Sequence, residues 1–274
     1  KIIAGLLLAF FLITLLRVLR APLRLALRLL GNTALGFAAL WCVRATTALT
    51  GITLGLNAFN ALVIGILGLP GFVLLIFLMT FFYTLGISHW LWNGVKTPIF
   101  MAGIAANIAA VEAGLAPMNI ATNEAVFTAG LITMGGMGAT LTLNLLMCFS
   151  KSKSLKTVGR LTILPSIFNI NEPIMYSAPI VMNPLLMVPM WINSITGPLV
   201  VWFTMRSGLL NIPSKMIQVG QIPAPLSSVM ITEDLRAILV YVVLFLIYLA
   251  TWYPFFKVYE KQRIAEEQSE ALNG

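Results

Sequence analysis

Charged residues are scarce in this chain of 274 residues. Only 9% of its residues are aspartate, glutamate, lysine or arginine, whereas 59% are hydrophobic. A soluble domain of this size needs far more charge to cover its surface. Several apolar runs approach or exceed the roughly 20 residues that cross a bilayer as a helix. The sequence therefore predicts an all-α polytopic membrane protein surrounded by lipid.

Several reactive groups are also missing or rare. The chain has one histidine, and its two cysteines, Cys42 and Cys148, lie in separate apolar segments without metal-ligand spacing. We therefore expect both thiols to be buried as small hydrophobic groups. The sequence contains no P-loop and no paired-acid metal site. We expect no metal, no cofactor and no catalytic residue in this chain.

The net charge of +8 is gathered in short stretches. These stretches hold Arg17, Arg20, Arg24 and Arg28; Lys151, Lys153, Lys156 and Arg160; and Lys257, Lys261 and Arg263. Basic residues grouped between apolar spans follow the positive-inside rule and are expected on the cytoplasmic side, together with the carboxy-terminal tail. Because they do not spread over a soluble face, no nucleic-acid partner is expected.

Five apolar runs are predicted to cross the membrane. They are Ile2–Leu19, Gly31–Thr50, Asn60–Leu85, Ala125–Phe149 and Leu235–Phe256. The third is broken at Gly68–Gly71, which predicts a kink or a re-entrant turn. A sixth apolar run, Ile174–Met205, carries four prolines, which predicts broken or hairpin segments rather than one straight helix. Pro98–Val111 is apolar but short for a span, and Ser150–Arg160 is predicted to be a loop.

The sequence Asn169-Ile170-Asn171-Glu172-Pro173 stands out within this apolar setting. A charged side chain at the bilayer centre costs about 2.5–3.5 kcal/mol, so Glu172 is expected to face a protein interior or a watery cavity. It either holds a polar solute or caps a helix or pairs with a cation. Asn169 and Asn171 share a face only in an extended chain, and either binds the solute or satisfies backbone groups near Pro173.

Other polar positions allow two interpretations each. His89 and Asn93 lie in the polar stretch Gly86–Thr97, where the histidine either binds solute or belongs to an interfacial aromatic belt. The tryptophans, including Trp90, are expected mainly as interface anchors. The glycines of the run Gly135–Gly138 allow close approach of a ligand or of another helix, and helix packing is preferred.

Two acidic residues are expected to play no part in a site. Glu112 and Glu124 flank a polar connection between apolar segments. We expect solvent to surround both carboxylates.

From about residue 80 onward the chain resembles the membrane (IIC) component of lactose/cellobiose-type sugar phosphotransferase systems. The resemblance rests on "TAGLITMGGMGATLTL" (128–143), "SKSKSLKTVG" (150–159) and "LPSIFNINEPIMYSAPIVMNP" (164–184). It implies that Glu172, Asn171 and Asn169 contact a sugar. It also matches the family's "GIHG" element to "LGISHW", in which His89 comes one position later than the histidine of the family, and it adds Asn93 as a neighbouring sugar-binding residue. A tryptophan usual in the family near residue 220 is replaced by glycine.

The resemblance also implies a function and partners. The chain would bind and translocate a sugar, such as the disaccharides cellobiose or lactose, in the bacterial plasma membrane. A separate phosphorylated IIB component in the cytoplasm would supply the phosphoryl group, so this chain would be a transport component. A homodimer is implied as well. The Lys151–Arg160 cluster would serve as a topology determinant and as a contact for the phosphorylated partner.

Residues 1–79 resemble the BofA family of sporulation membrane proteins. The resemblance rests on "PLRLALRLLGNTALGFAALW" and "GLNAFNALVIGILGLPGFVLL", with Arg44 and Asn60 departing from the family pattern. We therefore predict a BofA-like segment, 1–79, followed by the carboxy-terminal part of a IIC domain, 80–274. The alternative function is a membrane regulator that inhibits an intramembrane protease acting on a sigma-factor precursor. A remnant with neither activity is the third possibility.

Overall fold

The structure, a computed structural model, describes residues 68–217 and 222–273. The chain divides into two compact units, Lys1–Gly68 and Leu69–Gly274. The predicted spans Ile2–Leu19 and Gly31–Thr50 and the first basic group lie outside the described residues. The predicted boundary between residues 79 and 80 falls inside the first helix of the second unit, and the division into two families remains a prediction.

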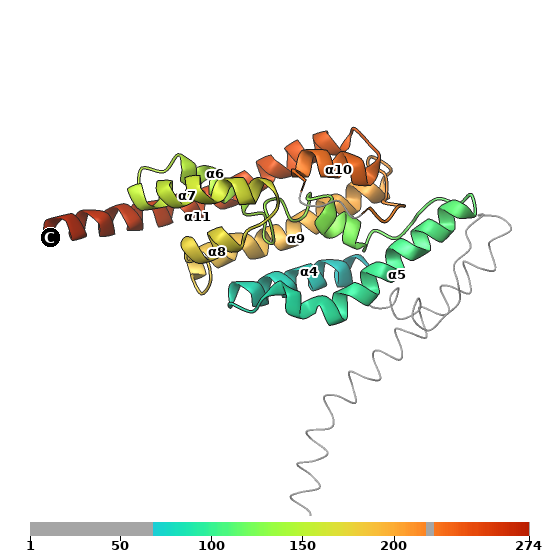
Figure 1. The fold of residues 1–274 in the computed structure, drawn as a ribbon, viewed down its shortest axis with the longest axis horizontal. Helices are drawn as coiled ribbons and strands as arrows, with labels where there is room; N and C mark the ends of the chain where they lie inside the picture. The colour runs from blue at the N-terminus through green and yellow to red at the C-terminus, as the bar shows by residue number, and fades with distance from the viewer. Residues whose placement is uncertain (1–67, 218–221, 274) are drawn as a thin grey trace, which may run out of the picture. The chain divides into compact units, whose positions relative to one another are not determined.

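The described part of the chain is helical (Figure 1). In chain order its elements are α4 (Leu69–Thr84), the 3₁₀ helix η1 (His89–Trp92), α5 (Asn93–Glu112), the π-helical turn η2 (Glu124–Thr128), α6 (Leu141–Cys148), α7 (Lys153–Ile167), α8 (Glu172–Ser177), α9 (Pro184–Arg206), α10 (Ala224–Thr232) and α11 (Ala237–Asn273). The predicted all-α class with interrupted helices is confirmed.

Within the described residues, three helical segments are long and apolar enough to cross a membrane. They are His89–Glu112, Pro184–Arg206 and Ala237–Leu272, and α4 is a shorter apolar helix. The protein is therefore a multi-pass membrane protein. Since about 20 residues suffice for a crossing, α11 is longer than a bilayer requires. Its first part is apolar and its part from Lys257 is charged and helical, as predicted, and a location of the charged part outside the membrane stays a prediction.

The prediction of a continuous span over Ala125–Phe149 is wrong. The chain leaves the helical path after η2, turns repeatedly, and resumes as α6 only at Leu141. Gly135, Gly136 and Gly138 have φ angles of +77°, +106° and +80°, which a right-handed helix does not allow. The glycines therefore shape a folded loop. The expected close approach of another helix holds at Gly138, where an added Cβ would lie 2.5 Å from the side chain of Met190 in α9.

Prolines interrupt helices less often than predicted. The stretch Ile174–Met205 is broken once, between α8 and α9, but Pro189 and Pro198 lie inside α9. Similarly, α5 starts at Asn93, before Pro98, and contains this proline. The helix is therefore longer than the predicted Pro98–Val111 run. A proline removes one backbone hydrogen bond, and neighbouring helices in a membrane protein compensate for that loss.

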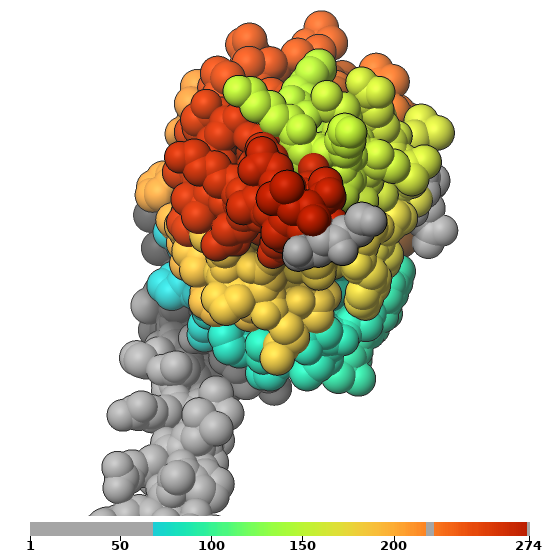
Figure 2. Space-filling model, turned by 90° about the vertical axis from the view of Figure 1, so that its left-hand side faces the viewer, coloured from blue at the N-terminus to red at the C-terminus, as the bar shows by residue number. Residues whose placement is uncertain are grey.

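The predicted basic loop Ser150–Arg160 is mostly the beginning of helix α7. Ser152 caps this helix by accepting a hydrogen bond from the backbone N–H of Leu155. The α11 tail completes the cap: Glu267 accepts from the Ser152 hydroxyl at 2.6 Å, and Glu260 accepts from the Ser150 hydroxyl at 2.7 Å. Figure 2 shows the end of α11 (red) lying against α6 and α7 (yellow-green). Two basic groups of the sequence thus share one end of the molecule.

Helix α11 also holds the loop between η2 and α6. The buried Tyr248 hydroxyl donates to the carbonyl oxygen of Leu131 at 3.0 Å. The buried Trp252 indole N–H donates to the carbonyl oxygen of Ala139, also at 3.0 Å. Because these carbonyl groups belong to an irregular loop, the side-chain donors replace missing backbone hydrogen bonds. The loop is thereby fixed as one wall of the site.

Candidate functional site

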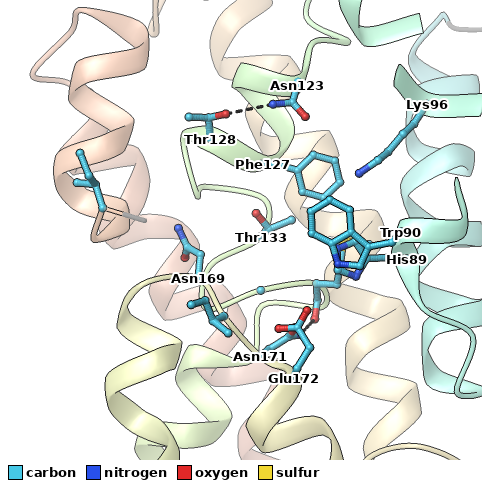
Figure 3. Close-up of a pocket in the computed structure, with 14 residues that line it drawn as sticks. His89, Trp90, Lys96, Asn123, Phe127, Thr128, Thr133, Asn169, Asn171 and Glu172 are labelled. Atoms are coloured by element: carbon cyan, nitrogen blue, oxygen red, sulfur yellow. Dashed lines mark hydrogen bonds between the residues drawn. The ribbon is translucent and has the colours of Figure 1, made fainter. Parts of the chain in front are cut away.

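A cavity of about 390 Å³ opens where η1, α5, η2, the glycine loop and the α7–α8 connection meet. Its lining residues are His89, Trp90, Lys96, Asn123, Phe127, Thr128, Thr133, Gly136, Met137, Asn169, Ile170, Asn171, Glu172 and Ile222. Figure 3 draws these residues as sticks and labels most of them. Four predicted site residues line the cavity: His89, Asn169, Asn171 and Glu172. Asn93 does not.

The α7–α8 connection turns the predicted polar cluster into the cavity. Helix α7 ends at Ile167, and Asn169 adopts a left-handed conformation with φ +62°, which asparagine tolerates better than most residues. Asn171 precedes α8, and Glu172 is the first residue of that helix. The cluster is thus neither an extended strand nor one helix, but a tight link between two helices.

Asn171 is buried, and both polar atoms of its side-chain amide form a hydrogen bond within the protein. Its Oδ1 accepts from the Tyr83 hydroxyl at 3.2 Å, and its Nδ2 donates to the Met137 carbonyl oxygen at 2.9 Å. Both hydrogen bonds join segments far apart in the sequence. Asn171 therefore holds α4, the glycine loop and α8 together, and it satisfies a backbone group of that loop rather than one near Pro173.

Asn169 and Glu172 keep polar atoms for the cavity. The Oδ1 atom of Asn169 accepts from the backbone N–H of Gly135 at 2.9 Å, while its Nδ2 has no partner among the described residues. Glu172 is half-buried, and its carboxylate makes no hydrogen bond or ion pair to another described residue. Glu172 is the first residue of α8 and its side chain makes no capping hydrogen bond to a described residue, and the carboxylate lies at the cavity (Figure 3).

His89 reaches the cavity from η1. Its ring centroid lies 5.3 Å from that of Tyr83 in an edge-to-face contact and 5.1 Å from that of Trp90. Its Nδ1 is buried and has no hydrogen-bond partner. Trp90 lines the same cavity and is 62% exposed, so this tryptophan presents a ring face to the site. The exposure of Trp90 is equally compatible with the interface-belt interpretation, so its role in the site stays a prediction.

The sequence-based interpretation missed Lys96 and Phe127. Lys96 is only 6% exposed, and its Nζ lies 4.1 Å from the centroid of the Phe127 ring. A lone cation next to an apolar run is subject to the same energetic rule that singled out Glu172, so that rule could have found it. Phe127 gave no such signal, because an aromatic residue is common in any apolar segment.

Glu124 is a second correction. The prediction of a solvated carboxylate holds for Glu112, which is exposed, but Glu124 is only 2% exposed. Its Oε2 atom is buried without a hydrogen-bond partner. The turn η2 folds back against the glycine loop and α10, which covers a position that a straight connection would expose.

The arrangement suits recognition of a polyhydroxylated solute. A carboxylate and an amide N–H₂ group offer an acceptor and donors without partners in the described structure, and Trp90 and Phe127 offer ring faces. Charge-assisted hydrogen bonds from hydroxyl groups to a carboxylate are stronger than neutral ones. A site that pairs its polar groups with hydroxyls also rejects solutes that lack them.

Comparison with known proteins agrees with this chemistry. The family model "Phosphotransferase system, EIIC" matches residues 1–194. The putative permease IIC component YwbA of Bacillus subtilis is 37% identical over 179 residues, which cover 65% of this chain and 40% of that protein. The cellobiose-specific EIIC component of Geobacillus stearothermophilus is 41% identical over 141 residues, 51% of this chain and 31% of that protein. The chain thus spans less than half the length of these curated relatives.

A solved structure extends the similarity to the fold. The transporter ChbC, the IIC component from the N,N′-diacetylchitobiose-specific phosphotransferase system, matches with a TM-score of 0.72 and 32% identity. The match covers 83% of this chain and 54% of ChbC.

The family match also bears on the first part of the chain. It begins at residue 1 and therefore includes the segment 1–79. The BofA resemblance of that segment remains a prediction, and none of these similarities supports it. With the family match over residues 1–194, the chain belongs to the phosphotransferase system EIIC family.

Proposed function

We propose that this chain binds a disaccharide in the cavity described above and serves in its translocation across the membrane. The observation that carries the proposal is the convergence of Glu172, Asn169 and His89 from two separate segments on one cavity, each with a polar atom that has no partner among the described residues. The cavity volume of about 390 Å³ lies in the range of small-molecule sites.

Each side chain has a defined role in this proposal. Glu172 accepts hydrogen bonds from sugar hydroxyls, and Asn169 donates to one through Nδ2. His89 positions the hydroxyl that receives a phosphoryl group. Trp90 stacks on a sugar ring, in place of the tryptophan that the sequence lacks near residue 220. Asn171 keeps the wall in shape without contacting the sugar directly.

The relatives support a proposal for the sugar and for the partners. Cellobiose, lactose and oligo-β-mannoside name the specificities of several matched proteins, which makes a disaccharide such as cellobiose or lactose the first probe. The phosphoryl donor is a phosphorylated IIB component. The joined basic ends of α7 and α11 support a cytoplasmic location for this face, by the positive-inside rule. They would also attract the phosphorylated partner, and the chain would function as a homodimer.

A binding titration tests the proposal. The purified chain in detergent is titrated with cellobiose and lactose by calorimetry, and Glu172→Gln is compared with Glu112→Gln. The removed charge-assisted bonds are worth about 10- to 100-fold in affinity. We expect that loss for Glu172→Gln and no change for Glu112→Gln, because Glu112 is exposed and outside the cavity.

Absence of saturable binding to either sugar by the unmodified chain contradicts the proposal. Equal affinities of Glu172→Gln and the unmodified chain contradict the role of Glu172. Inhibition of a protease through residues 1–79 is the second function that the sequence suggests. No observation on the described residues favours it, and unchanged precursor cleavage on co-expression would exclude it.

A further inference from the structure

The exposed face of helix α7 changes its character along the helix. Residues three and four apart lie on one face of a helix, and all exposed residues of α7 follow that spacing. They are Lys153, Thr157, Arg160, Leu161, Leu164 and Ile167. The first half of this face is basic and polar. The second half is apolar, with Leu161 74% and Leu164 64% exposed.

Aromatic and basic residues indicate where the membrane surface lies at this end of the molecule. Tyrosine rings and long cationic side chains gather at the boundary between lipid and water. On α11 the exposed Tyr253 has the Nζ of Lys257 5.7 Å from its ring centroid, and Phe149 is exposed at the end of α6. The hydrogen bond from the Ser150 hydroxyl to Glu260 puts the start of α7 at the level of this α11 segment. Helix α7 therefore starts near the membrane surface.

From that level α7 runs toward the membrane interior, because its other end leads to Asn169 and the cavity. Helix α7 lies beside α11 in both Figure 1 and Figure 2. At 1.5 Å per residue, Lys153 and Leu164 are about 17 Å apart along the axis, close to the depth of one lipid leaflet. The basic half of the face thus lies at the depth of lipid headgroups, and the apolar half at the depth of acyl chains.

The two cations of this face are free to meet an anion. Neither Lys153 nor Arg160 takes part in the four ion pairs found among the described residues. The nearby carboxylate of Glu267 accepts hydrogen bonds from the backbone N–H of Lys153 and from Ser152 and Ser154, at the start of the helix. The ammonium group of Lys153 and the guanidinium group of Arg160 have no anionic partner in the described structure.

We propose that the exposed face of α7 binds one anionic phospholipid of the adjoining leaflet. Its phosphate would lie between Lys153 and Arg160, and an acyl chain would lie along Leu161 and Leu164. Charge-assisted hydrogen bonds hold the phosphate, while the long basic side chains reach up to the headgroup level. A soluble phosphoprotein would meet the cations but would leave the two leucines uncovered, so a lipid fits the whole face better. The inference does not depend on the proposed sugar binding.

The experiment titrates the full chain, purified free of lipid in a neutral detergent, with dioleoylphosphatidylglycerol and dioleoylphosphatidylcholine. The bound lipid is counted by native mass spectrometry. Each basic residue near a membrane surface is worth about fivefold in affinity, so the anionic lipid should bind about 10- to 30-fold more tightly. The double variant Lys153→Gln/Arg160→Gln should lose this preference, whereas Lys261→Gln on the exposed tail should keep it. Leu164→Ser should weaken both lipids, and the equally exposed Leu239→Ser neither.

Three results would overturn the proposal. The first is equal affinity of the unmodified chain for the two lipids, and the second is an unchanged preference in the double glutamine variant. The third is binding of soluble glycerol 3-phosphate as tight as that of the anionic lipid, which would assign the face to a soluble phosphate-bearing partner. Melting temperatures without lipid identify a misfolded variant. The charge-conserving variant Lys153→Arg/Arg160→Lys then decides, because it must keep the preference for the anionic lipid.

Discussion

Replacement of Gly136 by alanine tests whether the glycine loop and Asn171 form one rigid wall of the cavity. A Cβ atom at position 136 would lie 2.5 Å from the Asn171 Cβ and 2.6 Å from its Oδ1. Ordinary contacts are about 1 Å longer. Asn171 cannot move aside without losing its hydrogen bonds to the Tyr83 hydroxyl and the Met137 carbonyl. The clash must therefore be relieved by shifting backbone.

The magnitude follows from two contributions. Alanine at a positive φ costs about 1–2 kcal/mol, and Gly136 has φ +106°. Overpacking against a fixed neighbour adds about 1–3 kcal/mol. Gly208 offers a matched control, because its φ is +75° but no atom lies within 4 Å of its added Cβ. Gly208→Ala should carry the conformational cost alone, so the two variants differ by about 1–3 kcal/mol.

The assay is thermal unfolding in detergent, followed by tryptophan fluorescence. For a chain of this size, 1 kcal/mol corresponds to about 2–4 °C. Gly136→Ala is therefore expected to melt about 2–12 °C below Gly208→Ala, and to bind cellobiose more weakly. Equal melting temperatures of the two variants would refute the reasoning, because they would show that the Asn171 wall yields without cost.

The remaining predictions concern α11. Trp252→Phe removes the 3.0 Å hydrogen bond to the buried carbonyl oxygen of Ala139 and leaves it only the longer bond, 3.4 Å, from the Thr142 hydroxyl. The loss should destabilise the chain by about 0.5–1.5 kcal/mol and lower the melting temperature; an unchanged temperature would contradict the role of this bond. Hydrogen bonds from the Ser152 hydroxyl and neighbouring groups lower the pKa of Glu267, outside the membrane, from 4.5 to about 2. Because the pKa of Glu267 is lower in the folded protein than in the unfolded one, its carboxylate stabilises the docked tail above about pH 5. This stabilisation is lost as the pH falls toward 2. Pepsin should therefore cleave the tail faster as the pH falls through this range. Glu267→Gln should flatten that dependence, and an unaltered pH profile would contradict it.

The sequence predicted much of the helical framework. The long apolar runs identified α9 and α11, and the charged tail from Lys257 is helical as expected. The hydrophobicity of a run is the sum over its own residues, so it can be read from the sequence without knowing which other helices pack against the run. Proline positions were less informative. Pro189 and Pro198 predict breaks in the run Ile174–Met205, yet both lie inside α9, because packing against other helices compensates for one lost hydrogen bond.

The site was predicted in part. Polar residues in apolar surroundings indicated Glu172, Asn169 and His89, and the structure brings them to one cavity. The rule that polar residues in apolar surroundings indicate a site did not distinguish residues that face the cavity from residues that hold its wall together. Both polar atoms of the Asn171 amide hydrogen-bond to Tyr83 and Met137. No feature of the local sequence distinguishes Asn171 from Asn169.

What the sequence determined by itself is the class of the protein and the chemistry of its polar cluster. Composition forces a membrane environment, and a carboxylate in that environment requires a polar cavity. Tertiary structure alone decided that the glycine run is a folded loop, that Trp90 faces the site, and that Lys96 lies beside it without an anionic partner. These features depend on contacts between residues far apart in the chain. Local sequence patterns carry little information about such contacts, because the free energy that selects them arises only when the helices pack.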